Sequence, residues 1–233
     1  MARDPIIVVV PARGGSKRVP RKNVRPFHGK PMLHWPLRAA QDTGLFDRIV
    51  VSTDDPDIAE AARAGGAEVP FLRDASLADD VTGTTDVVRD AVVRLRLPDD
   101  AAVCCLYPTA AFVQARDLAS GLEALREGGV PWVISVAAYR TPIQRAYLLK
   151  EDGLVEPAMP EYMPMRSQDL PQAFFDAGQF YWARAKTWRT AGLRVWDGAR
   201  PVMLDANRVV DIDTLSDWAY AERLFALWRE GAD

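Results

Sequence analysis

The chain has 233 residues, of which 48% are hydrophobic and 26% charged, a composition typical of a globular protein with its own core and not of a disordered chain. Its net charge of −3 disfavours a general binder of nucleic acid or of anionic membranes. The two cysteines, Cys104 and Cys105, are adjacent, so in a strand they would point to opposite faces. This spacing fits neither a disulfide framework nor a zinc site, and we expect a protein of the reducing cytoplasm.

Predicted strands and helices alternate along the chain as far as Ala138. The first apolar run, at residues 6–10, is too short for a signal sequence or a membrane span and indicates a buried strand. Similar β-branched runs follow at 49–52, 102–106 and 132–137, and helical spacing of apolar residues occurs between them at 32–41, 88–95 and 118–125. Strands that are apolar on both faces are typical of a parallel sheet covered by helices. We therefore predict an α/β fold with a doubly wound, mostly parallel sheet, whose ligands bind at the carboxyl ends of the strands.

The regular alternation stops after Ala138. The segment at about residues 139–171 is rich in proline with scattered aromatic residues, which suits an excursion that packs on a second subunit better than a central strand. We expect residues 1–233 to form one domain with a dimerisation insertion in this segment, and hence a homodimer. Strands at 179–183 and 202–204 follow, and the chain ends in a helix with an apolar stripe from Leu215 to Trp228.

A basic loop follows the first strand. The chain has no Asp or Glu from Pro5 to Gln41, but carries there Arg13, Lys17, Arg18, Arg21, Lys22, Arg25, Lys30 and Arg38. A solvated basic loop would normally carry interspersed acidic residues, so we expect an anionic ligand. Gly14 and Gly15 would let the backbone approach phosphates, which Arg13, Lys17 and Lys22 would neutralise. The loop matches neither the GxxxxGK[ST] nor the GxGxxG phosphate-binding pattern.

Two carboxylates, Asp211 and Asp213, precede the last helix. Alternate residues of an extended segment point to the same side, and a pair of carboxylates suits Mg²⁺ (or Mn²⁺) close to phosphates. The structural alternative is that Asp213 or Thr214 caps the helix, because Thr214 and Asp217 have the spacing of a capping box. The phosphate-binding loop elsewhere in the chain favours the metal site.

Several separated motifs resemble those of the sugar-nucleotide cytidylyltransferases. ARGGSKRVPRKN at residues 12–23 is similar to the family's triphosphate-binding signature, and Asp211-Ile212-Asp213 is similar to its D-x-D metal site. STDD at 52–55, RDASLADD at 73–80 and LYPT at 106–109 also match, so the resemblance extends over nearly the whole chain. It implies a nucleotidyltransferase fold of the Rossmann-like kind and binding of CTP by Ala12, Arg13, Gly14, Gly15, Ser16, Lys17, Lys22, Asn23 and Thr85. Capping of the helix that follows is the alternative role for Thr84 and Thr85.

The residues that would meet the sugar depart from the family's sialic-acid branch. Tyr107 replaces the Gln of its L-Q-P-T motif, and AAFV at 110–113 replaces S-P-L-R. TPIQR at 141–145 and DLPQAFFDAGQFYW at 169–182 instead resemble the pseudaminic-acid branch, in which the position of Phe175 is often His. The aromatic residues at 174–175 and 180–182 would offer apolar surface to the methyl group of such a sugar. The resemblance implies sugar binding by Tyr107, Gln144, Arg145, Arg166, Asp176 and Gln179.

The reaction implied is direct displacement at phosphorus. The anomeric hydroxyl of an acidic nine-carbon sugar, a nonulosonic acid, attacks the α-phosphate of CTP, and pyrophosphate leaves. Arg13 and Lys22 would stabilise the charge that develops on the triphosphate. We expect pseudaminic acid as the sugar, with N-acetylneuraminic, legionaminic and 3-deoxy-octulosonic acid as alternatives.

A rival function of another class is a non-catalytic RNA-binding protein that grips RNA with the basic loop. The basic residues lie in one loop behind a strand and have no aromatic residues interleaved with them, which disfavours that function. We therefore expect CTP and the sugar as partners, with no nucleic acid and no membrane.

Overall fold

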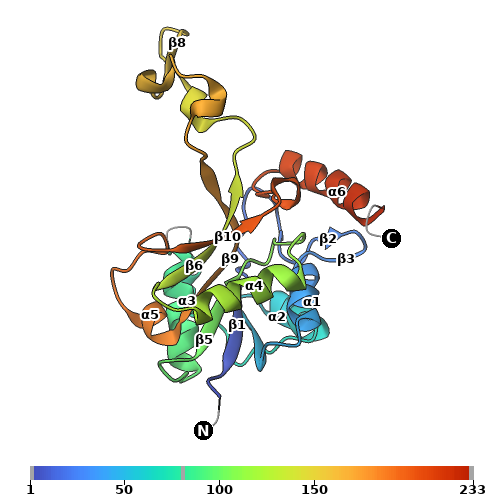
Figure 1. Cartoon of the computed structure of the whole chain (residues 1–233). Helices are drawn as coiled ribbons and strands as arrows, with labels where there is room; N and C mark the ends of the chain where they lie inside the picture. The colour runs from blue at the N-terminus through green and yellow to red at the C-terminus, as the bar shows by residue number, and fades with distance from the viewer. Residues whose placement is uncertain (1–2, 80–81, 231–233) are drawn as a thin grey trace.

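The computed structural model describes residues 3–79 and 82–230 and shows a six-stranded sheet with helices on both faces (Figure 1). The strands lie in the order β10-β6-β9-β5-β1-β4. Their bounds are Ile6–Pro11 for β1, Arg48–Ser52 for β4, Ala102–Leu106 for β5, Trp132–Ala138 for β6, Phe174–Arg184 for β9 and Arg200–Leu204 for β10. The predicted α/β fold is confirmed.

Strand β9 is the one antiparallel member of this sheet. β1 pairs in parallel with β4 and β5, and β10 pairs in parallel with β6, whereas β9 runs against both β5 and β6. Two consecutive parallel strands need a crossover connection, which returns the chain to the end of the sheet at which the first strand began. No such crossover lies between β6 and β9, since the chain leaves at Ala138 and re-enters at Phe174, paired with Ala138. It therefore has to run back antiparallel.

Within the described residues, six α-helices cover the two faces of the sheet or pack at its carboxyl edge. They are α1 (His34–Asp42), α2 (Pro56–Ala64), α3 (Thr84–Arg94), α4 (Ala115–Arg126), α5 (Ala185–Arg189) and α6 (Leu215–Glu230). Helices α1, α2 and α4 pack on one face of the sheet, and α3 and α5 pack on the other. Successive strand residues alternate between these layers, so Cys104 joins the first layer and Cys105 the second, both as free, buried thiols.

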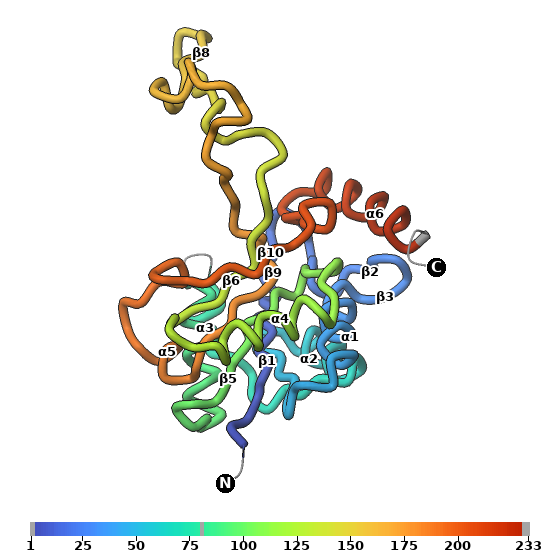
Figure 2. The backbone as a smooth tube through the Cα atoms, in the orientation of Figure 1, coloured from blue at the N-terminus to red at the C-terminus, as the bar shows by residue number. Residues whose placement is uncertain are grey.

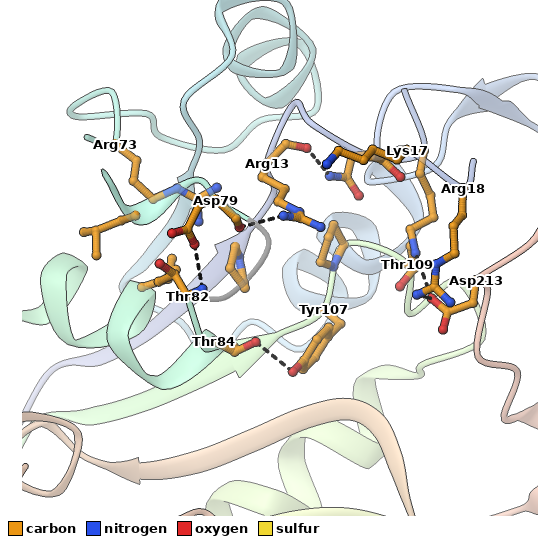
Figure 3. Close-up of a pocket in the computed structure, with 17 residues that line it drawn as sticks. Arg13, Lys17, Arg18, Arg73, Asp79, Thr82, Thr84, Tyr107, Thr109 and Asp213 are labelled. Atoms are coloured by element: carbon orange, nitrogen blue, oxygen red, sulfur yellow. Dashed lines mark hydrogen bonds and ion pairs between the residues drawn. The ribbon is translucent and has the colours of Figure 1, made fainter. Parts of the chain in front are cut away.

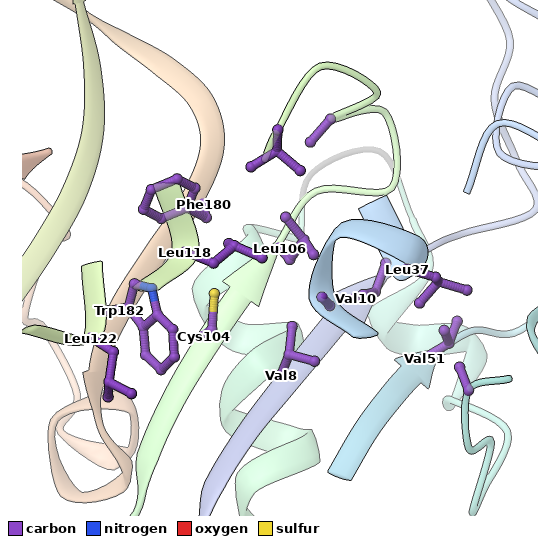
Figure 4. Packing of buried hydrophobic residues seen from close by; sticks show 14 of the residues in the cluster. Val8, Val10, Leu37, Val51, Cys104, Leu106, Leu118, Leu122, Phe180 and Trp182 are labelled. Carbon is purple, nitrogen blue, oxygen red and sulfur yellow. The ribbon is translucent and has the colours of Figure 1, made fainter. Parts of the chain in front are cut away.

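A large aromatic side chain, that of Trp182, packs in the apolar layer between α4 and the sheet (Figure 4). Trp182 of β9 is fully buried, and its ring stacks on Phe46 at a centroid distance of 5.5 Å. A Cβ atom on Gly121 of α4 would lie 2.5 Å from the Trp182 ring, so only glycine lets α4 approach the sheet this closely. Phe180 joins the same layer, and Tyr181 packs in the opposite one. The expectation that the aromatic residues 180–182 offer apolar surface to a sugar is therefore wrong for Phe180 and Trp182, which belong to the core.

A third apolar cluster lies between α6 and the segment that follows the basic loop. There β2 (Pro26–Phe27) and β3 (Lys30–Pro31) form a short hairpin. Phe27 is buried against Trp218 and Phe225 of α6, with centroid distances of 5.5 and 5.1 Å. The cluster also includes Ile212, between the two carboxylates of the D-x-D segment. Burial of these side chains thus ties the end of the basic loop, the D-x-D segment and the last helix into one unit.

Between β6 and β9 the chain forms an arm, residues 139–173, that projects away from the sheet (Figures 1 and 2). Its strands β7 (Tyr147–Leu149) and β8 (Val155–Pro157) pair with each other, and short 3₁₀ turns lie at Ile143–Arg145, Pro160–Tyr162 and Ser167–Asp169. Along the part of the chain described here, no helix combines the length and the apolar character needed to cross a membrane.

Candidate active site

A pocket of about 550 Å³ lies at the carboxyl ends of β1 and β5 (Figure 3). Pro11 ends β1, and Tyr107, Pro108 and Thr109 follow directly after β5. This is the edge where a sheet with helices on both faces was expected to bind its ligand. The remaining lining residues among those described are Arg13, Ser16, Lys17, Arg18, Lys22, Asn23, Arg73, Leu77, Asp79, Thr82, Thr84, Val87 and Asp213.

The basic loop is held in shape by its own polar groups. The Ala12 amide donates to the Ser52 carbonyl at 2.9 Å, which extends the pairing of β1 with β4 by one residue. The buried side chain of Asn23 donates from Nδ2 to the Arg13 carbonyl at 2.9 Å, so the two ends of the loop are joined. A Cβ atom on Gly14 would lie 2.6 Å from Asp55 Oδ2, whereas one on Gly15 would meet nothing within 4 Å. Close packing therefore requires glycine at position 14 but not at position 15.

Asp54 joins the loop to a second part of the pocket wall. Its Oδ1 atom accepts from the Gly14 amide and from Arg73 Nη2, both at 3.2 Å. The Arg73 side chain is almost completely buried, and this desolvation lowers the pKa of its guanidinium. Asp55 caps α2 by accepting from the amides of Asp57 and Ile58. Asp54 and Asp55 thus make the contacts of turn and cap residues at the end of β4.

Basic side chains outnumber acidic ones around the pocket. The described lining includes five basic residues and two acidic ones, Asp79 and Asp213. Lys22 is half-buried: its Nζ atom donates to the Ile212 carbonyl at 2.5 Å and lies 3.7 Å from Asp213 Oδ1. Burial lowers the pKa of Lys22, and the charges of Asp213 and Asp211 oppose that effect. An anion bound here would stabilise the charged form of this lysine further.

The D-x-D segment and the helix cap use different residues. Thr214 and Asp217 form the capping box at the start of α6, because Asp217 Oδ2 accepts from the Thr214 amide at 2.7 Å and Thr214 Oγ1 accepts from the Asp217 amide at 3.2 Å. The Asp213 carboxylate instead meets Arg18 Nη2 at 2.9 Å and lines the pocket. Asp213 is therefore not the residue that caps the helix.

The donor chemistry of this segment fits a hard divalent cation. Partial desolvation raises the pKa of Asp211, and the negative charge of the nearby Asp213 raises it further. Residues 3–79 and 82–230 contain no group of three or more His, Cys, Asp or Glu side chains placed so that together they could hold a metal. Phosphate oxygens or water would have to complete the coordination of any cation bound by these two residues.

The opposite wall of the pocket comes from α3 and the segment before it. Arg13 Nη1 donates to the Asp79 carbonyl at 2.6 Å, and Asp80, the last residue of the RDASLADD motif, lies outside the described residues. The capping role considered for Thr84 and Thr85 is wrong, because Gly83 occupies the N-cap of α3 without a side-chain bond. Thr84 instead lines the pocket, and its hydroxyl lies 3.0 Å from that of Tyr107; Thr85 is not part of the lining.

The structure separates the residues that were expected to bind the sugar. Tyr107 lines the pocket, but Gln144, Arg145, Arg166, Asp176 and Gln179 do not. The first three lie on the arm and hold it together: Gln144 Nε2 donates to the Pro171 carbonyl, Arg145 donates to the carbonyls of Met163 and Met165, and Arg166 pairs with Asp169. Asp176 and Gln179 lie on β9, where the Asp176 carboxylate accepts from the Gly178 amide and the Tyr181 hydroxyl.

Two residues line the pocket although the sequence analysis gave them no role in the site. Arg73 opens the RDASLADD motif, and Arg18 belongs to the acid-free basic stretch. A buried arginine needs a partner for its charge, which here is Asp54. Of the residues expected to bind CTP, the structure brings Arg13, Ser16, Lys17, Lys22 and Asn23 together around one pocket.

Comparison with known proteins adds independent findings. Residues 7–153 match the model of a protein family described as cytidylyltransferase. The chain is 36% identical over 228 residues to the pseudaminic acid cytidylyltransferase of Campylobacter jejuni. This alignment covers 97% of this chain and 98% of that protein. The chain is 31% identical over 229 residues to the CMP-N,N'-diacetyllegionaminic acid synthase of Legionella pneumophila, with 97% and 98% covered. A solved structure of CMP:2-keto-3-deoxy-manno-octonic acid synthetase complexed with CTP has a TM-score of 0.73 at 18% identity, over 96% of this chain and 99% of that chain.

Proposed function

The chain belongs to the cytidylyltransferase family, and from that premise we propose that it transfers CMP from CTP to the anomeric hydroxyl of a nonulosonic acid, pseudaminic acid, with release of pyrophosphate. The observation that carries the nucleotide half of this proposal is the convergence of Arg13, Lys17, Arg18 and Lys22 on one pocket at the carboxyl edge of the sheet. Such a convergence favours a compact polyanion over RNA, which would be bound by a stripe of basic residues across the surface.

In the proposed reaction the anomeric oxygen attacks the α-phosphorus of CTP, and its hydroxyl proton passes to solvent. The bond from that phosphorus to the bridging oxygen breaks, and the electron pair leaves with pyrophosphate. Negative charge builds up on the phosphate oxygens, so preorganised cations lower the barrier. Arg13 and Lys22 supply this stabilisation, and Asn23 and Asp54 keep the loop in place by their bonds to the Arg13 carbonyl and the Gly14 amide.

We assign Asp211 and Asp213 as the residues that would hold Mg²⁺ (or Mn²⁺). When bound, the cation would neutralise phosphate charge and polarise phosphoryl oxygens. Asp213 supports this role because its carboxylate lines the pocket. Asp211 supports it because partial burial, and then the nearby charge of Asp213, raise the pKa of its carboxyl, so a cation beside the pair would stabilise the charged form of Asp211.

Two observations favour pseudaminic acid as the sugar. The chain shares more of its sequence with a pseudaminic acid cytidylyltransferase, 36%, than with a CMP-N,N'-diacetyllegionaminic acid synthase, 31%, at the same coverage. Tyr107, with its aromatic ring, lines the pocket at the position where the sialic-acid branch has Gln. A partly aromatic wall suits a sugar that carries a methyl group in place of a hydroxyl.

A panel of sugars tests this proposal. We expect kcat/KM, measured by pyrophosphate release with CTP and Mg²⁺, to be highest for pseudaminic acid among pseudaminic, legionaminic, N-acetylneuraminic and 3-deoxy-octulosonic acid. N-acetylneuraminic acid should be slower by only about 100-fold, because a site with apolar contacts discriminates weakly against an added hydroxyl. A preference for N-acetylneuraminic acid would overturn the assignment of the sugar and leave the cytidylyltransferase activity in place. No pyrophosphate release with any of the four acids would contradict both.

We propose further that the protein is a homodimer whose arm contacts a second copy. Four apolar side chains near the β7–β8 hairpin are between 55% and 77% exposed, namely Leu148, Leu149, Leu154 and Val155. Such a cluster on a projecting arm is typical of a protein interface. If Gln144, Arg145 and Arg166 bind the sugar, they would do so in the pocket of that second copy, since none of them lines the pocket of their own chain.

Sedimentation velocity at micromolar concentration tests the dimer. The wild-type protein should sediment as a dimer, and Leu149→Glu with Leu154→Glu should give a folded monomer, because the charges would have to be buried without partners. Leu227→Glu is the matched control: Leu227 is 66% exposed on α6, so this variant should remain a dimer. A wild-type monomer, or a dimer that tolerates both arm substitutions, would refute the interface.

A further inference from the structure

A buried ion pair joins the chain just before the D-x-D segment to the start of α4. Arg208 ends the 3₁₀ turn Ala206–Arg208, which follows β10. Its Nη1 atom donates to Asp117 Oδ2 at 2.8 Å, and its Nη2 atom donates to Asp117 Oδ1 at 3.2 Å. The two side chains are only 10% and 8% exposed. Because both guanidinium nitrogens bond the same carboxylate, the pair fixes an orientation as well as a distance.

The same arginine also contacts the segment that continues the pocket wall after β5. Arg208 Nη1 donates to the Phe112 carbonyl at 3.1 Å. Phe112 lies between the pocket-lining residues 107–109 and the start of α4. Asp117 Oδ2 accepts from the Gln114 amide at 2.9 Å as well, which completes the capping box of α4. Arg208 therefore joins two segments that each supply residues to the pocket, the chain after β5 and the chain that leads to Asp213.

After Arg208 the side chains of the D-x-D segment alternate in burial. Val210 and Ile212 are buried in the third apolar cluster, whereas Asp211 is exposed and Asp213 is half-buried and lines the pocket. In an extended segment the position of one residue decides to which side each following side chain points. Apolar burial has no preferred direction, but a two-bond ion pair has one. The ion pair of Arg208 is therefore the contact that fixes where this segment begins.

We propose that Arg208 and Asp117 are positioning residues for the metal ligands. Their ion pair sets the register of the D-x-D segment against the chain after β5, so that Asp213 reaches the pocket with Asp211 beside it. Neither Arg208 nor Asp117 lines the pocket, so both act through the segment and touch neither substrate nor cation. This inference rests on the proposed function, in which Asp211 and Asp213 hold the cation.

A contribution to stability alone is a weaker explanation of this pair. Removal of two charges from water costs about as much free energy as their attraction returns, so uncharged replacements of a buried pair often leave a protein equally stable. The best-documented benefit of buried polar groups is that they specify a register. Removal of both charges should therefore keep the fold and loosen the D-x-D segment.

The double variant of Asp117→Asn and Arg208→Met tests the proposal. It removes both charges together, so that neither stays buried without a partner, and the asparagine oxygen can still accept from the Gln114 amide. We expect the Mg²⁺ concentration for half-maximal activity to rise at least about tenfold, because residues behind metal ligands typically change metal affinity by 10- to 100-fold. In the metal-free protein, the backbone amides of residues 209–213 should exchange their hydrogen faster than in the wild type. The melting temperature should stay close to that of the wild type.

The matched control is the double variant of Glu127→Gln and Arg200→Met. Arg200 of β10 bonds Glu127 at 2.6 Å and the Ala124 and Gly128 carbonyls, so it also ties the chain around β10 to α4, but at the other end of that helix. This control should change neither the Mg²⁺ dependence nor the exchange of residues 209–213. Arg208→Lys is a second variant, which keeps the charge and loses the two-bond geometry, and it should also raise the Mg²⁺ requirement.

A folded double variant of Asp117 and Arg208 with the Mg²⁺ dependence of the wild type would overturn the inference, whether or not its melting temperature falls. If that variant does not fold, Arg208→Lys decides, and a wild-type Mg²⁺ dependence in it overturns the inference. The ligand variants Asp211→Asn and Asp213→Asn separate the two claims. If they leave the Mg²⁺ dependence unchanged, the proposed metal site fails and this inference with it. If they change it and the Arg208 variants do not, the inference alone is refuted.

Discussion

Replacing Lys22 with methionine is expected to lower kcat for CMP transfer at least about 100-fold, by analogy with the loss of one preorganised donor to a transition state. Methionine keeps an unbranched stem of similar length, so the main change is the loss of the ammonium group. That group lies between Asp213 and the Ile212 carbonyl in a partly buried position, where its charge is screened less than at the surface. Arg13→Ala should have an effect of similar size, because Arg13 lines the same pocket.

The measurement is steady-state pyrophosphate release at saturating CTP and sugar, with circular dichroism to show that the variant is folded. Lys186→Met provides the control, because Lys186 lies on α5, pairs with Asp100 and is 60% exposed in its side chain. Its kcat should match that of the wild type. A folded Lys22→Met protein with near-normal kcat would refute the catalytic role of Lys22, whereas a raised KM for CTP with normal kcat would limit Lys22 to uniform binding.

The second large effect is expected at the D-x-D segment. Asp213→Asn and Asp211→Asn should each raise the Mg²⁺ concentration for half-maximal activity at least about tenfold, since even residues behind the metal ligands typically change affinity by 10- to 100-fold. Both variants should keep the melting temperature close to that of the wild type, because Thr214 and Asp217 form the cap of α6. Thermal unfolding and Mg²⁺ titration of activity measure the two quantities separately.

Asp217→Ala is the reciprocal control. It removes the carboxylate of the capping box and should lower the melting temperature by about a few degrees, with unchanged Mg²⁺ dependence. If Asp213→Asn instead lowers the melting temperature and leaves the Mg²⁺ dependence unchanged, Asp213 is a structural residue and the metal site lies elsewhere.

Local sequence patterns were sufficient for much of the fold. The buried strands at 6–10, 49–52 and 102–106 were predicted within one residue at each end, because residues apolar on both faces occur in short runs between helical segments. The basic loop was also visible, since an absence of acidic residues over so long a stretch is a property of the sequence alone. That Thr214 and Asp217 cap the last helix followed from their spacing, although the same spacing could not exclude Asp213 as the cap.

The sequence by itself determined the α/β class, the position of the basic loop after β1 and the pair of carboxylates before α6, because each depends on residues close together in the chain. Only the tertiary structure decided which distant residues meet. In the structure Arg73 donates a hydrogen bond to Asp54, and Arg166 lies on the arm and does not line the pocket. The structure also shows that β9 runs antiparallel to its neighbours. It also brought Asp176 to Tyr181, because a bulge opposite Ser135 changes the register of β9. Strand order and register depend on packing between segments far apart in sequence, and local periodicity carries no information about them.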